Sequence, residues 1–136
     1  DASHFRHFYK AFVRAFARAA GWQKERQSET ELATWRDLNR ALCQVTKTGE
    51  PVPFATQEVR AAYATQHLEG RAGHLAHILA LAPEELDQPV GCRTMGSLRK
   101  VVLASEGADA RQIVSAGGGP GFDGIGLAAF LLYAKS

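Results

Sequence analysis

The chain has 136 residues, of which 46% are hydrophobic and 22% charged, as in an ordinary globular protein. Its formal net charge of +2 is too small to indicate nucleic-acid binding from the total alone. No run approaches the roughly 18 consecutive apolar residues that predict a transmembrane helix. Cys43 and Cys92 show neither C-x-x-C spacing nor the density of a disulfide scaffold, so we expect a soluble protein of a reducing compartment, cytoplasmic or organellar.

Residues 3–20 are predicted to form an amphipathic helix that starts at Ser3 and stops at Gly21. Basic residues recur every four positions on one side, and aromatic residues gather on the other. The basic set is Arg6, Lys10, Arg14 and Arg18, and the aromatic set is Phe5, Phe8, Tyr9, Phe12 and Phe16. Several interpretations stay open: a core helix with a solvated basic side, a contact for an acidic partner or nucleic acid, a membrane-surface helix, or a presequence-like mitochondrial segment.

The middle of the chain is also predicted to be helical. The expected helices cover residues 30–47, 56–68, 74–81 and 96–105, with one further helical turn over 83–87. Residues 23–31 are polar and aperiodic, which is typical of a linker, and Gly70 and Gly73 are expected to interrupt the chain between two helices.

His74 and His77 stand three positions apart, on one helix face if their segment is helical. A metal site would also need a third ligand and a supporting carboxylate, and neither occurs at a recognisable spacing. We therefore predict packing or surface histidines and no metal site.

The most informative stretch, residues 111–133, has the pattern of a short strand, a glycine loop and an apolar helix. Ile113 and Val114 supply the β-branched strand signal. The glycines that follow allow a sharp turn, and the apolar run from Asp123 onward is long enough for a helix that packs on a sheet. A strand, a glycine turn and a helix N-terminus together are typical of a binding site for a polar or anionic cofactor.

Three interpretations of this loop compete. Gly119-Pro120-Gly121-Phe122-Asp123-Gly124 matches the dinucleotide fingerprint G-x-G-x-x-G, but this frame leaves surplus residues between the strand and the first glycine. The frame Gly117-x-Gly119-x-Gly121 follows the strand directly and resembles motif I of the class I S-adenosylmethionine-dependent methyltransferases. A structural glycine turn is the third interpretation.

The resemblance implies S-adenosylmethionine as cofactor, with the loop passing under its methionine part. An acidic residue usually stands two places before the first glycine, and Ser115 occupies that position here. The cofactor-binding residues that the resemblance implies are Ser115, Gly117, Gly119, Gly121, Phe122 and Asp123. Asp123 is equally suited to capping the helix. Residues that bind the methyl acceptor usually lie well downstream of motif I in this family, so no catalytic residue is assigned.

We therefore predict a mostly α chain, with a helical region over residues 1–110. Residues 111–136 would form the first strand, glycine loop and helix of a Rossmann-like α/β methyltransferase fold, truncated before a second strand. The predicted function is that of a methyltransferase-like protein or fragment with a degenerate motif I, inactive alone and in need of its missing half or a protein partner. The alternative is a non-enzymatic subunit of a large organellar or ribonucleoprotein assembly, docking through its basic, aromatic first helix.

Overall fold

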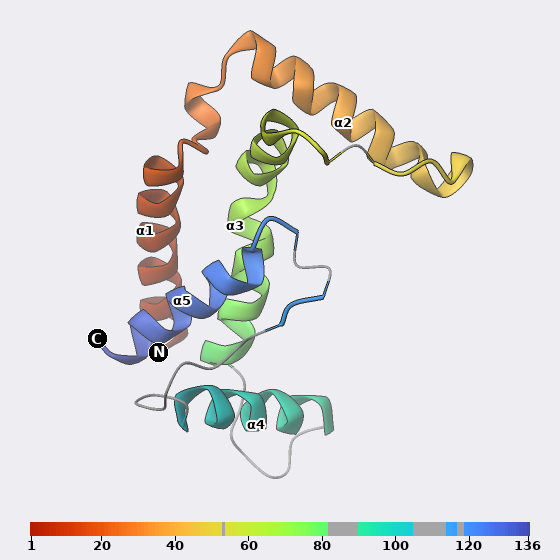
Figure 1. Ribbon diagram of the computed structural model, residues 1–136. Helices are drawn as coiled ribbons and strands as arrows, with labels where there is room; N and C mark the ends of the chain where they lie inside the picture. Colours follow the sequence, from red (N-terminus) through yellow and green to blue (C-terminus); the bar gives the residue numbers. More distant parts are fainter. Residues whose placement is uncertain (53, 82–89, 105–113, 117–118) are drawn as a thin grey trace. The chain divides into compact units, whose positions relative to one another are not determined.

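The computed structural model describes residues 1–52, 54–81, 90–104, 114–116 and 119–136 (Figure 1). All regular structure within these ranges is helical. The helices are α1 (Ala2–Ala20), α2 (Glu29–Thr48), α3 (Gln57–Leu81), α4 (Val90–Ala104) and α5 (Phe122–Ala134), with a 3-10 helix at Lys24–Arg26.

The prediction of a Rossmann-like β-α unit is wrong for the described residues, which contain no strand. Ile113 lies outside these residues, and Val114 has irregular backbone and an 83% exposed side chain. A parallel strand is buried on both faces and needs a neighbouring strand to pair its backbone groups. In the described part of the chain, Val114 is not buried and has no neighbouring strand. The helical half of the prediction is confirmed, because α5 follows the glycine loop.

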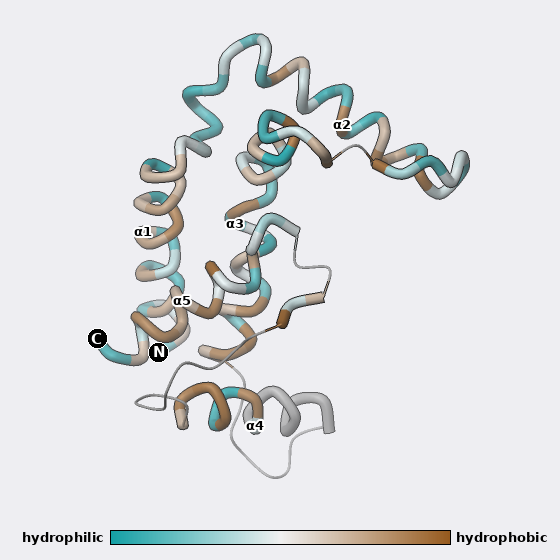
Figure 2. Tube along the Cα trace, in the orientation of Figure 1, coloured by the Kyte–Doolittle hydropathy of each residue, from teal (hydrophilic) through white to brown (hydrophobic). Residues whose placement is uncertain are grey.

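The chain divides into two compact units, one joining Asp1–Val13 to Glu69–Ser136 and the other comprising Arg14–Leu68. In the first unit, α1, α3 and α5 share an apolar core. Its buried members are Phe5, Tyr9, Val13, Ala72, Ala76, Leu79, Phe122, Ile125, Ala129 and Phe130. Apolar residues run along most of α5 (Figure 2), which is typical of a helix buried on most sides.

Small residues let the helices of this unit approach closely. A Cβ atom on Gly126 of α5 would collide with the backbone carbonyl oxygen of Ala72 in α3. On α3 itself, a Cβ atom on Gly73 would lie 3.0 Å from the hydroxyl oxygen of Tyr9. Gly70 and Gly73 do not interrupt α3 as expected. A glycine inside a helix costs only about 1 kcal/mol, which the close packing of Tyr9 against Gly73 offsets.

In the second unit, a capping box starts α2 inside the segment that was expected to be a linker. The hydroxyl of Ser28 accepts a hydrogen bond from the Glu31 amide (3.2 Å), and the Glu31 carboxylate accepts one from the Ser28 amide (3.1 Å). The ring of His67 on α3 contacts those of Trp35 and Tyr63, with centroids 5.3 Å and 4.5 Å away. The Trp35–His67 contact ties α2 to the first half of α3, and Leu38 of α2 is buried.

The fourth helix begins earlier than its expected start at residue 96. The guanidinium of Arg99 donates hydrogen bonds to the carbonyls of Leu79 (3.2 Å) and Ala80 (3.4 Å). These carbonyls belong to the last turn of α3, where helical partners are lacking, so Arg99 acts as a C-terminal cap.

Candidate functional site

The glycine loop before α5 has the backbone that its sequence requires. Gly119 and Gly121 have φ angles of +58° and +89°, in the left-handed region that side chains disfavour. Gly121 is the N-cap of α5, so the loop leads directly into a helix N-terminus. Gly117, the first glycine of the predicted motif, lies outside the described residues.

The ends of this loop are joined by a side-chain hydrogen bond. The hydroxyl of Ser115 donates to a carboxylate oxygen of Asp123, which stands in the first turn of α5. Asp123 is therefore not the N-cap, and its charge instead interacts favourably with the positive end of the helix dipole. Phe122 is only 3% exposed, so its ring belongs to the core of its unit.

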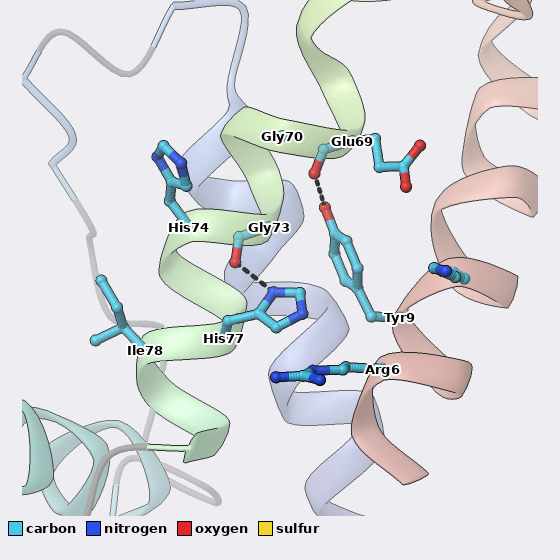
Figure 3. Close-up of a pocket in the computed structure, with 9 residues that line it drawn as sticks. Arg6, Tyr9, Glu69, Gly70, Gly73, His74, His77 and Ile78 are labelled. Atoms are coloured by element: carbon cyan, nitrogen blue, oxygen red, sulfur yellow. Dashed lines mark hydrogen bonds between the residues drawn. The ribbon is translucent and has the colours of Figure 1, made fainter. Parts of the chain in front are cut away.

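A second candidate site is a pocket of about 560 Å³ between the first half of α1 and the second half of α3 (Figure 3). Its lining residues are Arg6, Tyr9, Lys10, Glu69, Gly70, Gly73, His74, His77 and Ile78. The two helices run antiparallel here, because Tyr9 meets Glu69 while Phe5 meets His77, eight residues further along α3.

Tyr9 forms one wall of the pocket. Its hydroxyl donates a 2.5 Å hydrogen bond to the backbone carbonyl of Glu69. Burial, and to a lesser degree the negative charge of the Glu69 side chain, raises the pKa of Tyr9 well above its ordinary value. The phenol therefore stays protonated and keeps its hydrogen bond to the Glu69 carbonyl.

His77 forms the base of the pocket and is held in one orientation. Its Nδ1 atom lies 2.7 Å from the carbonyl oxygen of Gly73. Since a carbonyl only accepts, Nδ1 carries a hydrogen and the neutral ring has Nε2 as its acceptor. Edge contacts with Phe5 and Tyr9, both at 5.0 Å between centroids, fix the ring plane. His77 can thus present one defined nitrogen to a ligand.

His74 and His77 have no further metal ligands near them in the part of the chain that the structure describes. No group of three or more histidine, cysteine, aspartate or glutamate residues able to hold a metal ion occurs there. His74 is exposed, and Figure 3 shows its ring directed away from that of His77. The two imidazoles are therefore not arranged as a shared ligand pair.

The aromatic side of α1 packs inside the chain. Phe5 and Tyr9 are buried, and the ring of Tyr133 lies against Phe5 and Phe8 at centroid distances of 5.0 Å and 5.4 Å. A membrane-surface helix needs a free apolar face, so this packing opposes that interpretation of α1. Among the helices that the structure describes, none has the length and apolar character needed to cross a membrane.

Comparison with protein-family models, curated proteins and solved structures finds no match to this chain. The function of this chain is therefore inferred from its own residues.

Proposed function

We propose that this chain is a methyltransferase-like protein whose loop over residues 115–123 binds part of S-adenosylmethionine, without transferring a methyl group by itself. The observation that carries the proposal is the left-handed backbone at Gly119 and Gly121 immediately before the start of α5. The sequence of the loop resembles motif I, and Gly119 and Gly121 adopt backbone conformations that favour glycine.

The first turn of α5 supports a role in binding a polar group. Gly121 has no side chain to cap the helix, so no side-chain hydrogen bond is made from this N-cap position. The first amides of a helix lack intrahelical acceptors and attract carboxylate or phosphate oxygens. The carboxylate of the cofactor's methionine part has the required charge. Ser115 donates a hydrogen bond to Asp123 in the same first turn, which joins the two ends of the loop.

The proposal includes inactivity of the chain alone. A loop and one helix end contact only one part of a cofactor of this size. Methyl transfer also requires an acceptor held in line with the sulfonium and shielded from water. The resemblance assigns that task to residues downstream of motif I.

Calorimetric titration with S-adenosylmethionine tests this proposal. Gly121→Ala forces a side chain into the left-handed region, and we expect it to weaken binding about tenfold. Gly124→Ala is the matched control, because Gly124 has ordinary φ and open space around its missing Cβ. Absence of heat with the unmodified chain, or equal weakening by the two variants, would reject the loop as a cofactor site. Circular dichroism checks that both variants keep their helices.

A second candidate function is a non-enzymatic subunit that binds an acidic partner or nucleic acid. The observation in its favour is the exposed basic side of α1, made of Arg6, Lys10, Arg14 and Arg18. None of these four forms a salt bridge within the part of the chain that the structure describes. Because the aromatic side of α1 is engaged internally, docking would use the basic side alone.

Binding of single-stranded RNA, measured at several salt concentrations, tests this second candidate. Phosphate contacts release counterions, so affinity should fall steeply with salt and disappear when all four basic residues are changed to glutamine. Binding that survives the fourfold change would eliminate this function.

A further inference from the structure

The pocket between α1 and α3 combines two unpaired cations with one fixed imidazole nitrogen. Arg6 and Lys10 are exposed and one helical turn apart, and neither has a salt-bridge partner among the described residues. His77 lines the same pocket, with its Nδ1–H committed to the carbonyl of Gly73. We propose that this pocket binds a small oxyanion of the phosphate class through Arg6, Lys10 and His77. This inference is independent of the cofactor loop.

The charges along the pocket place the anion at one end of it. Among the described residues, Glu69 is the one carboxylate in the lining, and it lies eight residues before His77 on α3, about 12 Å along the helix axis. Figure 3 shows Arg6 reaching toward α3 beside His77, while Glu69 lies beyond Tyr9. Repulsion by Glu69 therefore directs an anion toward Arg6 and His77.

The three proposed groups suit phosphate in different ways. Arg6 and His77 lie at this end, and Lys10 follows Tyr9 on α1, nearer the level of Glu69. The planar guanidinium of Arg6 can donate two parallel hydrogen bonds to oxygens of one phosphate, and the ammonium of Lys10 adds a point charge. His77 Nε2 donates a hydrogen bond when the ring is protonated, or accepts one from a protonated phosphate oxygen. The hydroxyl of Tyr9 is already used by Glu69, so it shapes the wall without serving the ligand.

The size of the pocket indicates a small molecule. Its volume of about 560 Å³ lies within the usual range for small-ligand sites. An extended polyanion would instead follow the whole basic side of α1, including Arg14 and Arg18. These two residues therefore provide matched controls, since they carry the same charge on the same helix but do not line the pocket.

The test is an NMR titration with inorganic phosphate at fixed pH and fixed ionic strength, in which the ring signals of His77 are followed. We expect a saturable shift, absent when chloride replaces phosphate. Arg6→Gln should weaken binding about tenfold, because a charge-assisted contact is lost. Glu69→Gln should strengthen it, and Arg18→Gln should change it by less than about twofold, since exposed charges beyond a Debye length are screened.

Three results would overturn the assignment. The first is a shift that does not saturate or that chloride reproduces. The second is equal weakening by Arg6→Gln and Arg18→Gln, which would identify a polyanion surface. The third is phosphate binding without a shift of the His77 ring, which would put the anion outside this pocket, for example in the neighbouring hollow that Arg6 and Lys10 line together with Asp1, Ser3 and His7.

Discussion

The hydroxyl of Tyr9 donates a 2.5 Å hydrogen bond to the carbonyl of Glu69, across the interface of α1 and α3. The residues are 60 positions apart in the sequence, so this bond fixes how the two helices pair. The ring of Tyr9 also lies on Gly73, where no larger residue fits without displacing it. One side chain thus sets both the register of the helix pair and a wall of the pocket.

Replacing Tyr9 by phenylalanine should lower the free energy of unfolding by about 1 kcal/mol, the usual net contribution of one hydrogen bond. Tyr133→Phe is the control, because the Tyr133 hydroxyl forms no hydrogen bond with any residue that the structure describes, while its ring packs on Phe5. Urea unfolding of the three proteins measures the difference. Equal stability of the two variants would show that the Tyr9 bond does not hold the helices together.

Alkaline pH should destabilise the protein partly through Tyr9. Its pKa is raised in the folded state, so the unfolded chain releases the phenolic proton above about pH 10 while the folded chain keeps it. The unfolded state then binds fewer protons, and the free energy of unfolding falls as pH rises. Urea unfolding at pH 8 and near pH 10.5 should show a larger loss for the unmodified protein than for Tyr9→Phe. An identical loss would contradict the assigned environment.

Gly126→Ala should destabilise the first unit by about 1–3 kcal/mol, the range for overpacking a core. Its new Cβ would meet the carbonyl of Ala72, and backbone cannot move aside as a flexible side chain can. Gly124→Ala, two positions away in the same helix and open to space, should be neutral or stabilising by helix propensity. Thermal unfolding of Gly126→Ala and Gly124→Ala measures the difference in stability. Equal stability of the two variants would mean that α5 does not cross α3 at Gly126.

Ser28→Ala should destabilise the second unit by about 1 kcal/mol, because the Glu31 amide loses its capping acceptor. Thr46→Ala, at an exposed position inside α2, removes a hydroxyl with no capping role and should have little effect. Circular dichroism during urea unfolding compares them. If Thr46→Ala has the larger effect, the capping box does not start α2.

Sequence patterns predicted helices well where one face was strongly apolar. The expected helix over residues 3–20 is α1 within one residue at its start, and that over 30–47 is α2 within one residue at each end. Gly70 and Gly73 lie inside α3 instead of interrupting it. The space beside Gly73 is filled by the ring of Tyr9, a contact between residues far apart in sequence that local patterns do not reveal. The Ser-x-x-Glu spacing of Ser28 and Glu31 is the signature of a capping box, and it indicates a helix start inside the segment predicted to be a linker.

The strand prediction failed for a related reason. Two β-branched residues favour extended backbone, but a strand also needs a neighbour, which sequence periodicity does not reveal. The positive φ angles at Gly119 and Gly121, in contrast, follow from glycine itself. The pocket at Tyr9 and His77 could not be predicted, because it depends on which turn of α3 faces α1.

The most direct test of the cofactor proposal is to follow backbone amide signals by NMR while S-adenosylmethionine is added. The account predicts saturable shifts at Gly119, Gly121 and Phe122, with the His77 ring unaffected. Shifts confined to the His77 pocket would mean that the cofactor's anionic group binds in that pocket and not at the loop. No shift at Gly119, Gly121 or Phe122 would contradict the proposal and leave the loop as a structural turn before α5.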